Sequence, residues 1–320
     1  MKRFVTVGLG AVLLAPLLAL AQPYPNKPIR LLIPYGAGGT TDIMARALQE
    51  PLYKALGQPV VVENKAGASG VLAAREVARA KPDGYTLFFV NNGNVAVTPF
   101  VVKDAGYDAK DFAPVALVSS APLFVVTNAD MRVADFKGFI DQVKKQGQPI
   151  TYASAGVGSF GHLSTELLAK TTGIKAIHVP YRGQAATTNA LVAGEVKLLV
   201  TTASSAMNEF ISAGRLKLLG VTSPEPSPLA PGAPTIGSFV PGYEAESWFA
   251  ILTTAGTPPE IVNRLNTVIN EILSSPDLQQ RFRGFGVRVQ TATPQRLGEM
   301  INKEIARWSV IVRENNIQAE

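Results

Sequence analysis

The chain has 320 residues, no cysteine and a formal net charge of +6. The absence of cysteine excludes disulfides and thiolate metal ligands. The positive charge is spread along the chain without a dense cluster of basic and aromatic residues, so composition argues against nucleic-acid binding and suits an acidic small molecule. The length is sufficient for two domains of ordinary size.

Residues 1–21 have the pattern of an export signal. Lys2 and Arg3 form a charged start, an apolar run extends from 4 to 20, and small residues precede a cleavage point after Ala21. An uncleaved membrane anchor is the alternative, but Pro16 and two glycines interrupt a run already near the lower limit for spanning a bilayer. Cleavage removes two positive and no negative charges, so the formal charge falls from +6 to +4.

Apolar strand-like runs then alternate with helical patterns, which is typical of parallel or mixed sheets covered by helices. We expect strands at 29–33, 59–63, 85–90, 123–127, 150–153, 175–179, 197–201 and 217–222. The three-to-four spacing of apolar residues predicts helices at 71–80 and 163–170. The pattern indicates two α/β lobes.

Two helices carry proline signals. Pro51 lies inside the first helical pattern, so we expect a kink or a new start near Glu50. Thr293 and Pro294 are a cap and a first-position proline for the last helix. Its apolar stripe predicts a core face made of Leu297, Ile301, Ile305, Trp308 and Val312.

A glycine-rich loop follows the first strand. Gly36, Gly38 and Gly39 precede Thr40 and Thr41, where a helix is predicted to begin. Backbone N–H groups at a helix start, at the positive end of its dipole, can bind an anion. A bare tight turn is an equal alternative for one such loop. The next residue, Asp42, is interpreted as a helix cap. Tyr35, which precedes the loop, either lines a pocket or packs against neighbouring side chains.

A second glycine loop follows the strand at 150–153 and runs from Ser154 to His162. It contains a formal G-x-G-x-x-G, at Gly156, Gly158 and Gly161. A nicotinamide-cofactor site also needs an acidic residue about twenty positions later, and 178–184 has none. We therefore expect Ser159 to offer its hydroxyl and N–H to a carboxylate instead.

A third candidate contact follows the strand at 175–179. Arg182 can pair with a carboxylate as a two-pronged donor, but a solvated surface arginine is an equally good interpretation.

Catalytic and metal motifs fail inspection. No G-x-S-x-G is present, and neither histidine, His162 or His178, has an acid at the spacing of a catalytic triad. The chain also has no cysteine to complete a zinc site with them. His162 is expected to cap or pack at its helix start, where it is also a candidate ligand contact, and His178 to lie in a strand. Binding without catalysis, metal or cofactor is what remains.

Together these motifs resemble the receptors of the tripartite tricarboxylate transporter family, also called Bug proteins, over essentially the whole mature chain. The landmarks are 34–35 with 38–42, 62–65 with 67–68, 82–87, 111–115, 158–159 with 162–163, 179–183, and 248–249 followed by 255–258.

The resemblance implies a periplasmic protein with a two-lobed fold like type II periplasmic binding proteins, each lobe a mixed sheet flanked by helices. It implies lobes at 22–120 plus 222–320 and at 121–221, with the ligand in the cleft between them. Family receptors hold a carboxylate through backbone amides and ordered waters, so we expect the loops 35–41 and 154–159 to grip its two ends. The implied donors are the N–H groups of Gly38, Gly39, Gly158 and Ser159, with the hydroxyls of Thr40 and Thr41.

The end of the strand at 197–201 departs from the family pattern. Many relatives have an acid there that pairs with an amino group, whereas this chain has Lys197, Thr201 and Thr202. With Thr202 as a candidate contact, we expect a di- or tricarboxylate or an aromatic acid without an ammonium. The implied partners are membrane transporter subunits, and a monomer is expected. The alternatives are an exported enzyme that uses Ser159 and His162, and a sensory receptor for a membrane kinase.

Overall fold

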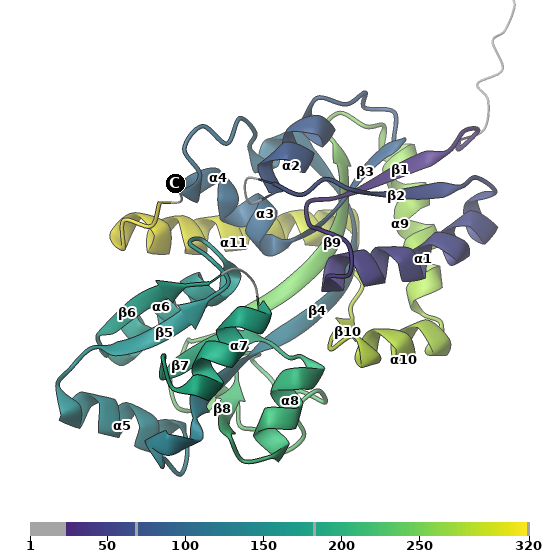
Figure 1. Ribbon diagram of the computed structural model, residues 1–320. Coiled ribbons are helices and arrows are strands. Elements are labelled where there is room, and N and C mark those ends of the chain that lie inside the picture. The colour runs from purple at the N-terminus through teal and green to yellow at the C-terminus, as the bar shows by residue number, and fades with distance from the viewer. Residues whose placement is uncertain (1–23, 68–69, 182–183, 319–320) are drawn as a thin grey trace, which may run out of the picture.

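The computed structural model describes residues 24–67, 70–181 and 184–318, so the predicted export signal and Arg182 lie outside the described residues. Two lobes are joined by long strands that run from one to the other (Figure 1). Within the described ranges, no helix has the length and apolar character needed to cross a membrane.

The first lobe opens with a parallel unit that brings the first glycine loop to the edge of the sheet. Its elements are β1 (Ile29–Ile33), α1 (Thr40–Leu56), β2 (Val60–Asn64), α2 (Val71–Ala78), β3 (Thr86–Asn91), α3 (Asn92–Ala96) and α4 (Thr98–Val101). Strand β1 lies between β2 and β3 and is parallel to both. Successive β1 residues on opposite faces are buried, which explains why the run is apolar without alternation.

Helix α1 continues through Pro51 as a single helix, so the predicted new start near Glu50 is wrong. Proline removes one N–H from the helical ladder, at a cost. The buried face of α1, with Met44, Leu48 and Leu52, packs continuously into the core of the first lobe on both sides of the proline. Tertiary packing therefore outweighs the local signal.

Two strands connect the lobes. They are β4 (Phe112–Asn128) and β9 (Glu246–Thr254), which pair antiparallel. The first part of β4 pairs with β9 as far as Pro122, and from Leu123 onward β4 pairs with strands of the second lobe. The sequence pattern predicted only 123–127 of β4 and no strand at the position of β9. The crossing point of the chain thus lies near Pro122.

The second lobe builds its own sheet on the far end of β4. Its elements are α5 (Phe136–Gln146), β5 (Ile150–Ser154), α6 (Phe160–Thr172), β6 (Ala176–Pro180), α7 (Gln184–Ala193), β7 (Leu198–Thr202), α8 (Ser205–Ser212) and β8 (Leu216–Val221). Strands β6, β5 and β7 are parallel to one another, while β7 and β8 run antiparallel to β4. The strands predicted in this region are confirmed. The second glycine loop emerges where β5 ends.

The C-terminal region returns to the first lobe and then contacts the second. It comprises α9 (Pro259–Leu273), α10 (Pro276–Gly284), β10 (Arg288–Val289) and α11 (Pro294–Glu314), and short 3₁₀ turns lie at Ala109–Asp111, Ala129–Met131 and Ile236–Ser238. Thr293 caps α11 by accepting a hydrogen bond from the N–H of Arg296 at 3.2 Å, as predicted. Trp308 is fully buried and packs against Phe160 of α6 with ring centroids 5.2 Å apart. Helix α11 therefore ties the C-terminus to the second lobe.

Candidate functional site

A cavity of about 840 Å³ lies between the two lobes. The first lobe contributes Tyr35, Asn91, Asn94 and Thr98, and the second contributes the loop 155–160. None of the described residues that line this cavity has a charged side chain. The volume is in the range of small-molecule sites, roughly 300–1,000 Å³. Among the described residues, the groups that this cavity offers to an anion are N–H and O–H donors.

The first glycine loop connects Tyr35, which lines this cavity, to the start of α1. Gly39 is the N-cap and offers no side-chain cap, so the N–H groups of Thr40 and Thr41 have no partner in the helix. Tyr35 lines the cavity, whereas Gly38, Gly39, Thr40 and Thr41 lie outside the lining of this conformation.

Asp42 lies in the first turn of α1 and bonds back to the loop, whereas the N-cap predicted for it is occupied by Gly39. Its Oδ2 accepts the N–H of Gly38 at 2.9 Å, and its carboxylate also accepts hydrogen bonds from Arg46 and Asn64. Burial alone raises the pKa of Asp42, but these hydrogen bonds outweigh burial and hold the pKa below its ordinary value. The expected Gly38 donor is therefore already used by Asp42 in this conformation.

Tyr35 and Asn94 form a fixed polar wall. The Tyr35 hydroxyl donates to Asn94 Oδ1 at 2.9 Å, and the same oxygen accepts the backbone N–H of Asn91 at 3.2 Å. Burial raises the pKa of Tyr35 to about 12, so its hydroxyl is neutral. Asn91, Asn94 and Thr98 were not predicted from the sequence as site residues. The signal was present, since Asn91 ends β3 and carboxyl ends of parallel strands commonly line ligand sites.

The second glycine loop is ordered by its own hydrogen bonds. The N–H of Ser159 donates to Gly156 O at 3.1 Å, and the N–H of Gly158 donates to His162 Nδ1 at 3.0 Å. Gly158 and Ser159 line the cavity as expected, but neither amide is free to donate to a ligand in this conformation. In the described part of the chain, the amides of Ala155 and Val157 have no partner. They replace Gly158 and Ser159 as candidate donors.

Ser154 and His162 lie behind this loop rather than in the cavity. Ser154 is 1% exposed and His162 is 5% exposed, and neither lines the inter-lobe space. Ser154 Oγ lies 2.6 Å from His178 Nε2, a contact that the sequence did not predict. The expected ligand contacts of Ser154 and His162 are thus replaced by contacts inside the second lobe. His162 packs at its helix start and His178 lies in β6, both as predicted.

The remaining candidates do not join the cavity. Thr202 ends β7, is half-buried and lies outside the lining, and its carbonyl accepts a hydrogen bond from Gln184. Arg182 lies outside the described residues.

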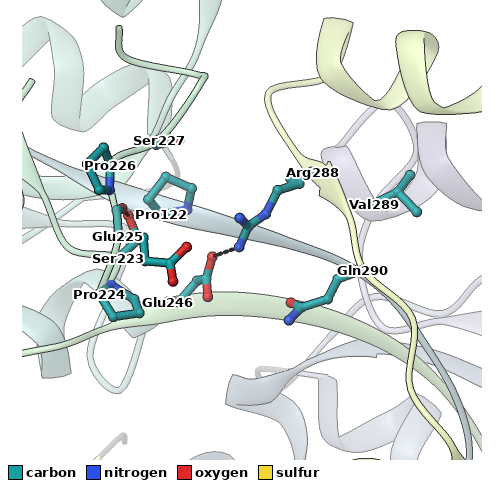
Figure 2. A pocket seen from close by; sticks show the side chains of 10 residues that line it. All are labelled: Pro122, Ser223, Pro224, Glu225, Pro226, Ser227, Glu246, Arg288, Val289 and Gln290. Carbon is teal, nitrogen blue, oxygen red and sulfur yellow. Dashed lines mark hydrogen bonds and ion pairs between the residues drawn. The ribbon is translucent and has the colours of Figure 1, made fainter. Parts of the chain in front are cut away.

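A second cavity, of about 470 Å³, lies where the strands cross between the lobes. Figure 2 shows its charged residues, Glu225, Glu246 and Arg288, with Arg288 Nη2 bonded to Glu246 Oε1 at 3.3 Å. Glu246 also accepts the Ser120 hydroxyl at 2.9 Å. With two carboxylates and one guanidinium that is already paired, this cavity disfavours an anion. Of these two cavities, the space between the lobes is the candidate anion site.

The family of this chain follows from its similarity to known proteins. Residues 44–317 match the model of the tripartite tricarboxylate transporter family receptor. The chain belongs to this family. The resemblance inferred from the sequence is thus confirmed.

Three solved structures of similar proteins extend the match to the fold. Rpa4515 of R. palustris, solved with adipate, is 33% identical, covers 92% of this chain and 99% of its own, and has a TM-score of 0.79. The periplasmic binding protein BugD is 31% identical, with coverage of 93% and 100% and a TM-score of 0.76. MatC of Rhodopseudomonas palustris, solved with malate, is 30% identical, with coverage of 90% and 100% and a TM-score of 0.75.

These matches confirm the predicted α/β, two-lobed fold. The family and its solved members are receptors, so the chain is a solute-binding receptor and not an enzyme.

Proposed function

We propose that this receptor encloses a small organic carboxylate between its lobes in the periplasm and delivers it to a tripartite membrane transporter. The observation that carries the proposal is the neutral cavity to which both lobes contribute. A ligand that contacts both lobes favours the closed state, and a transporter can recognise loaded receptor by that state.

Backbone donors on both sides of the cleft support an anionic ligand. On the first lobe, Gly39, Thr40 and Thr41 present N–H groups at the positive end of the α1 dipole. On the second lobe, the amides of Ala155 and Val157 are without partners among the described residues. Charge-assisted hydrogen bonds of this kind are each worth about 1.5–3 kcal/mol. A dicarboxylate whose two ends reach both groups of donors bridges the lobes directly or through waters.

The lining also favours a ligand without an ammonium group. Relatives in this family have been solved with adipate and with malate, neither of which carries one. The described lining has no acidic side chain that would pair with a buried ammonium. Burying an unpaired charge is costly, so an amino acid is expected to bind less well than a matched hydroxy acid.

Malate and aspartate give the sharpest test of the preference against an ammonium group, because they differ only in a hydroxyl in place of the amino group. A thermal-shift screen of mature protein against dicarboxylates, tricarboxylates and aromatic acids identifies ligands, since a ligand of the folded state raises Tm. Calorimetric titration should then show weaker binding of L-aspartate than of L-malate or adipate, with each compound recovered unchanged. Tighter binding of aspartate contradicts the ligand class, and the absence of any binding carboxylate contradicts the function.

We also propose four features that the sequence predicts. They are cleavage after Ala21, lobes at 22–120 plus 222–320 and at 121–221, a monomeric state, and membrane transporter subunits as partners. N-terminal sequencing of exported protein and light scattering of the mature chain test the first and third. Loss of ligand uptake on deletion of the receptor distinguishes transport from the sensory alternative.

A further inference from the structure

Two histidine rings are stacked behind the second glycine loop. His162 comes from α6 and His178 from β6, and their ring centroids lie 3.8 Å apart with planes inclined by 11°. Tyr152 of β5 packs beside both rings, with its centroid 5.1 Å from that of His178 and 6.1 Å from that of His162. The two histidines therefore pack among two neighbouring strands and a helix.

Each ring is bonded to one end of the same loop. His178 Nε2 is hydrogen-bonded to Ser154 Oγ at 2.6 Å, where the loop leaves β5. His162 Nδ1 accepts the N–H of Gly158 at 3.0 Å, just before α6 begins. Within the loop, Ser154 Oγ also accepts the N–H of Gly156 at 3.1 Å. The segment between these two anchors contains Ala155 and Val157, the candidate ligand donors.

The hydrogen bond to Gly158 defines the tautomer of His162. A backbone N–H can only donate, so Nδ1 must be an unprotonated acceptor and the ring proton lies on Nε2. That nitrogen faces Glu166, with Oε1 at 4.0 Å. Burial, with a smaller effect of His178, lowers the pKa of His162 to about 3, and burial lowers that of His178 to about 4. Both rings are therefore neutral near pH 7.

The loop needs such anchors because its glycines are permissive. Gly156 has φ of 134° and Gly158 has φ of 73°. Glycine adopts positive φ about as readily as negative φ, so these residues alone do not fix the loop conformation. Fixing a loop before the ligand arrives removes an ordering cost from binding. We propose that His162 and His178 are positioning residues, which hold the second-lobe loop at both ends so that its free amides face the ligand. This inference rests on the proposed function of that loop.

Two substitutions of one residue separate hydrogen bonding from packing. His162→Phe keeps a ring in the stack but removes the acceptor for Gly158, whereas His162→Asn loses the ring but keeps an oxygen near the position of Nδ1. We expect the Phe variant to bind adipate roughly tenfold more weakly, the Asn variant to recover to within about threefold of the original, and the Gly158 amide to exchange faster only in the Phe variant.

Thr165→Val is the matched control. Thr165 is fully buried in the same helix, and its hydroxyl donates to Gly161 O at 2.7 Å in the first turn of α6, outside the segment between Ser154 and Gly158. This variant also loses one buried hydrogen bond, so it should lower Tm without changing adipate affinity or Gly158 exchange.

Several outcomes overturn the inference. They are unchanged affinity and exchange in His162→Phe, an equal loss in His162→Asn, and an equal loss in Thr165→Val. Nitrogen chemical shifts of the unsubstituted protein give a test that needs no variant, because a protonated Nδ1 on His162 excludes the bond to Gly158. If no carboxylate binds the original protein, the proposed function fails, while amide exchange in the ligand-free variants still decides whether these histidines hold the loop.

Discussion

The backbone of Gly158 and the side chain of Val101 touch across the two lobes. A Cβ placed on Gly158 would lie 2.7 Å from Val101 Cγ1, and the φ of Gly158 is 73°. Gly158 belongs to the second-lobe loop and Val101 ends α4 of the first lobe. The approach of the lobes at this point therefore depends on the absence of a side chain at 158.

Gly158→Ala should impair closure. The added methyl both meets Val101 and imposes a left-handed conformation on alanine, which costs about 1–2 kcal/mol by itself. We expect at least about a tenfold loss of adipate affinity by calorimetry. Gly147→Ala is the control, because Gly147 has φ of 67° and nothing within 4 Å of its added Cβ. Equal affinity losses in both variants would count against a role in closure.

Gly39→Val tests the first loop without strain. Gly39 has φ of −77°, and an added Cβ meets only Gly36 O at 3.7 Å, so the variant should fold with nearly unchanged Tm. The branched side chain obstructs approach to the N–H groups at the start of α1. Losing one charge-assisted hydrogen bond should weaken dicarboxylate binding about tenfold or more in the same titration. Unchanged affinity would remove this loop from the site.

Stability should fall below neutral pH because of His162. Its pKa is about 3 in the folded protein against 6.5 ordinarily, so below 6.5 the unfolded chain binds more protons than the folded one. The stabilisation is complete above 6.5 and is lost as the pH falls toward the folded value. Between about pH 7.5 and about pH 5, this group should remove about 2 kcal/mol from the free energy of unfolding.

Urea denaturation at both pH values measures this effect. Tyr152, Glu166 and His178 surround His162, and other carboxylates also titrate in this range, so the informative quantity is the difference from His162→Phe. The variant should have a shallower pH dependence. An equally steep profile would mean that His162 is charged in the folded protein.

Glu246→Gln distinguishes the two cavities. The amide keeps an oxygen for Ser120 but loses the charge that pairs with Arg288. Since this ion pair is partly exposed, we expect a stability loss below about 1 kcal/mol and adipate affinity within about twofold of the original. Clearly tighter adipate binding after removal of this negative charge would instead place the anion in the cavity of Figure 2.

Local sequence patterns predicted the local structure well. The alternation of strands and helices, the Thr293 and Pro294 start of α11, and the glycine loops after β1 and β5 are all present. Strand β9 was missed, since a strand buried on nearly every residue has no alternation to separate it from other apolar segments. The continuous α1 also escaped prediction, because packing against the core overrides one proline.

The sequence by itself determined the positions of the two glycine loops and the class of receptor to which the chain belongs. Those properties reside in short motifs whose glycines, caps and helix starts act over a few residues. Only the tertiary structure decided which amides remain free. The N–H of Gly38 is taken by Asp42, and that of Gly158 by His162. The second lobe brings His178, 16 positions from His162, into a stack with it. Hydrogen-bond partners depend on distances in the fold, which motif spacing does not specify.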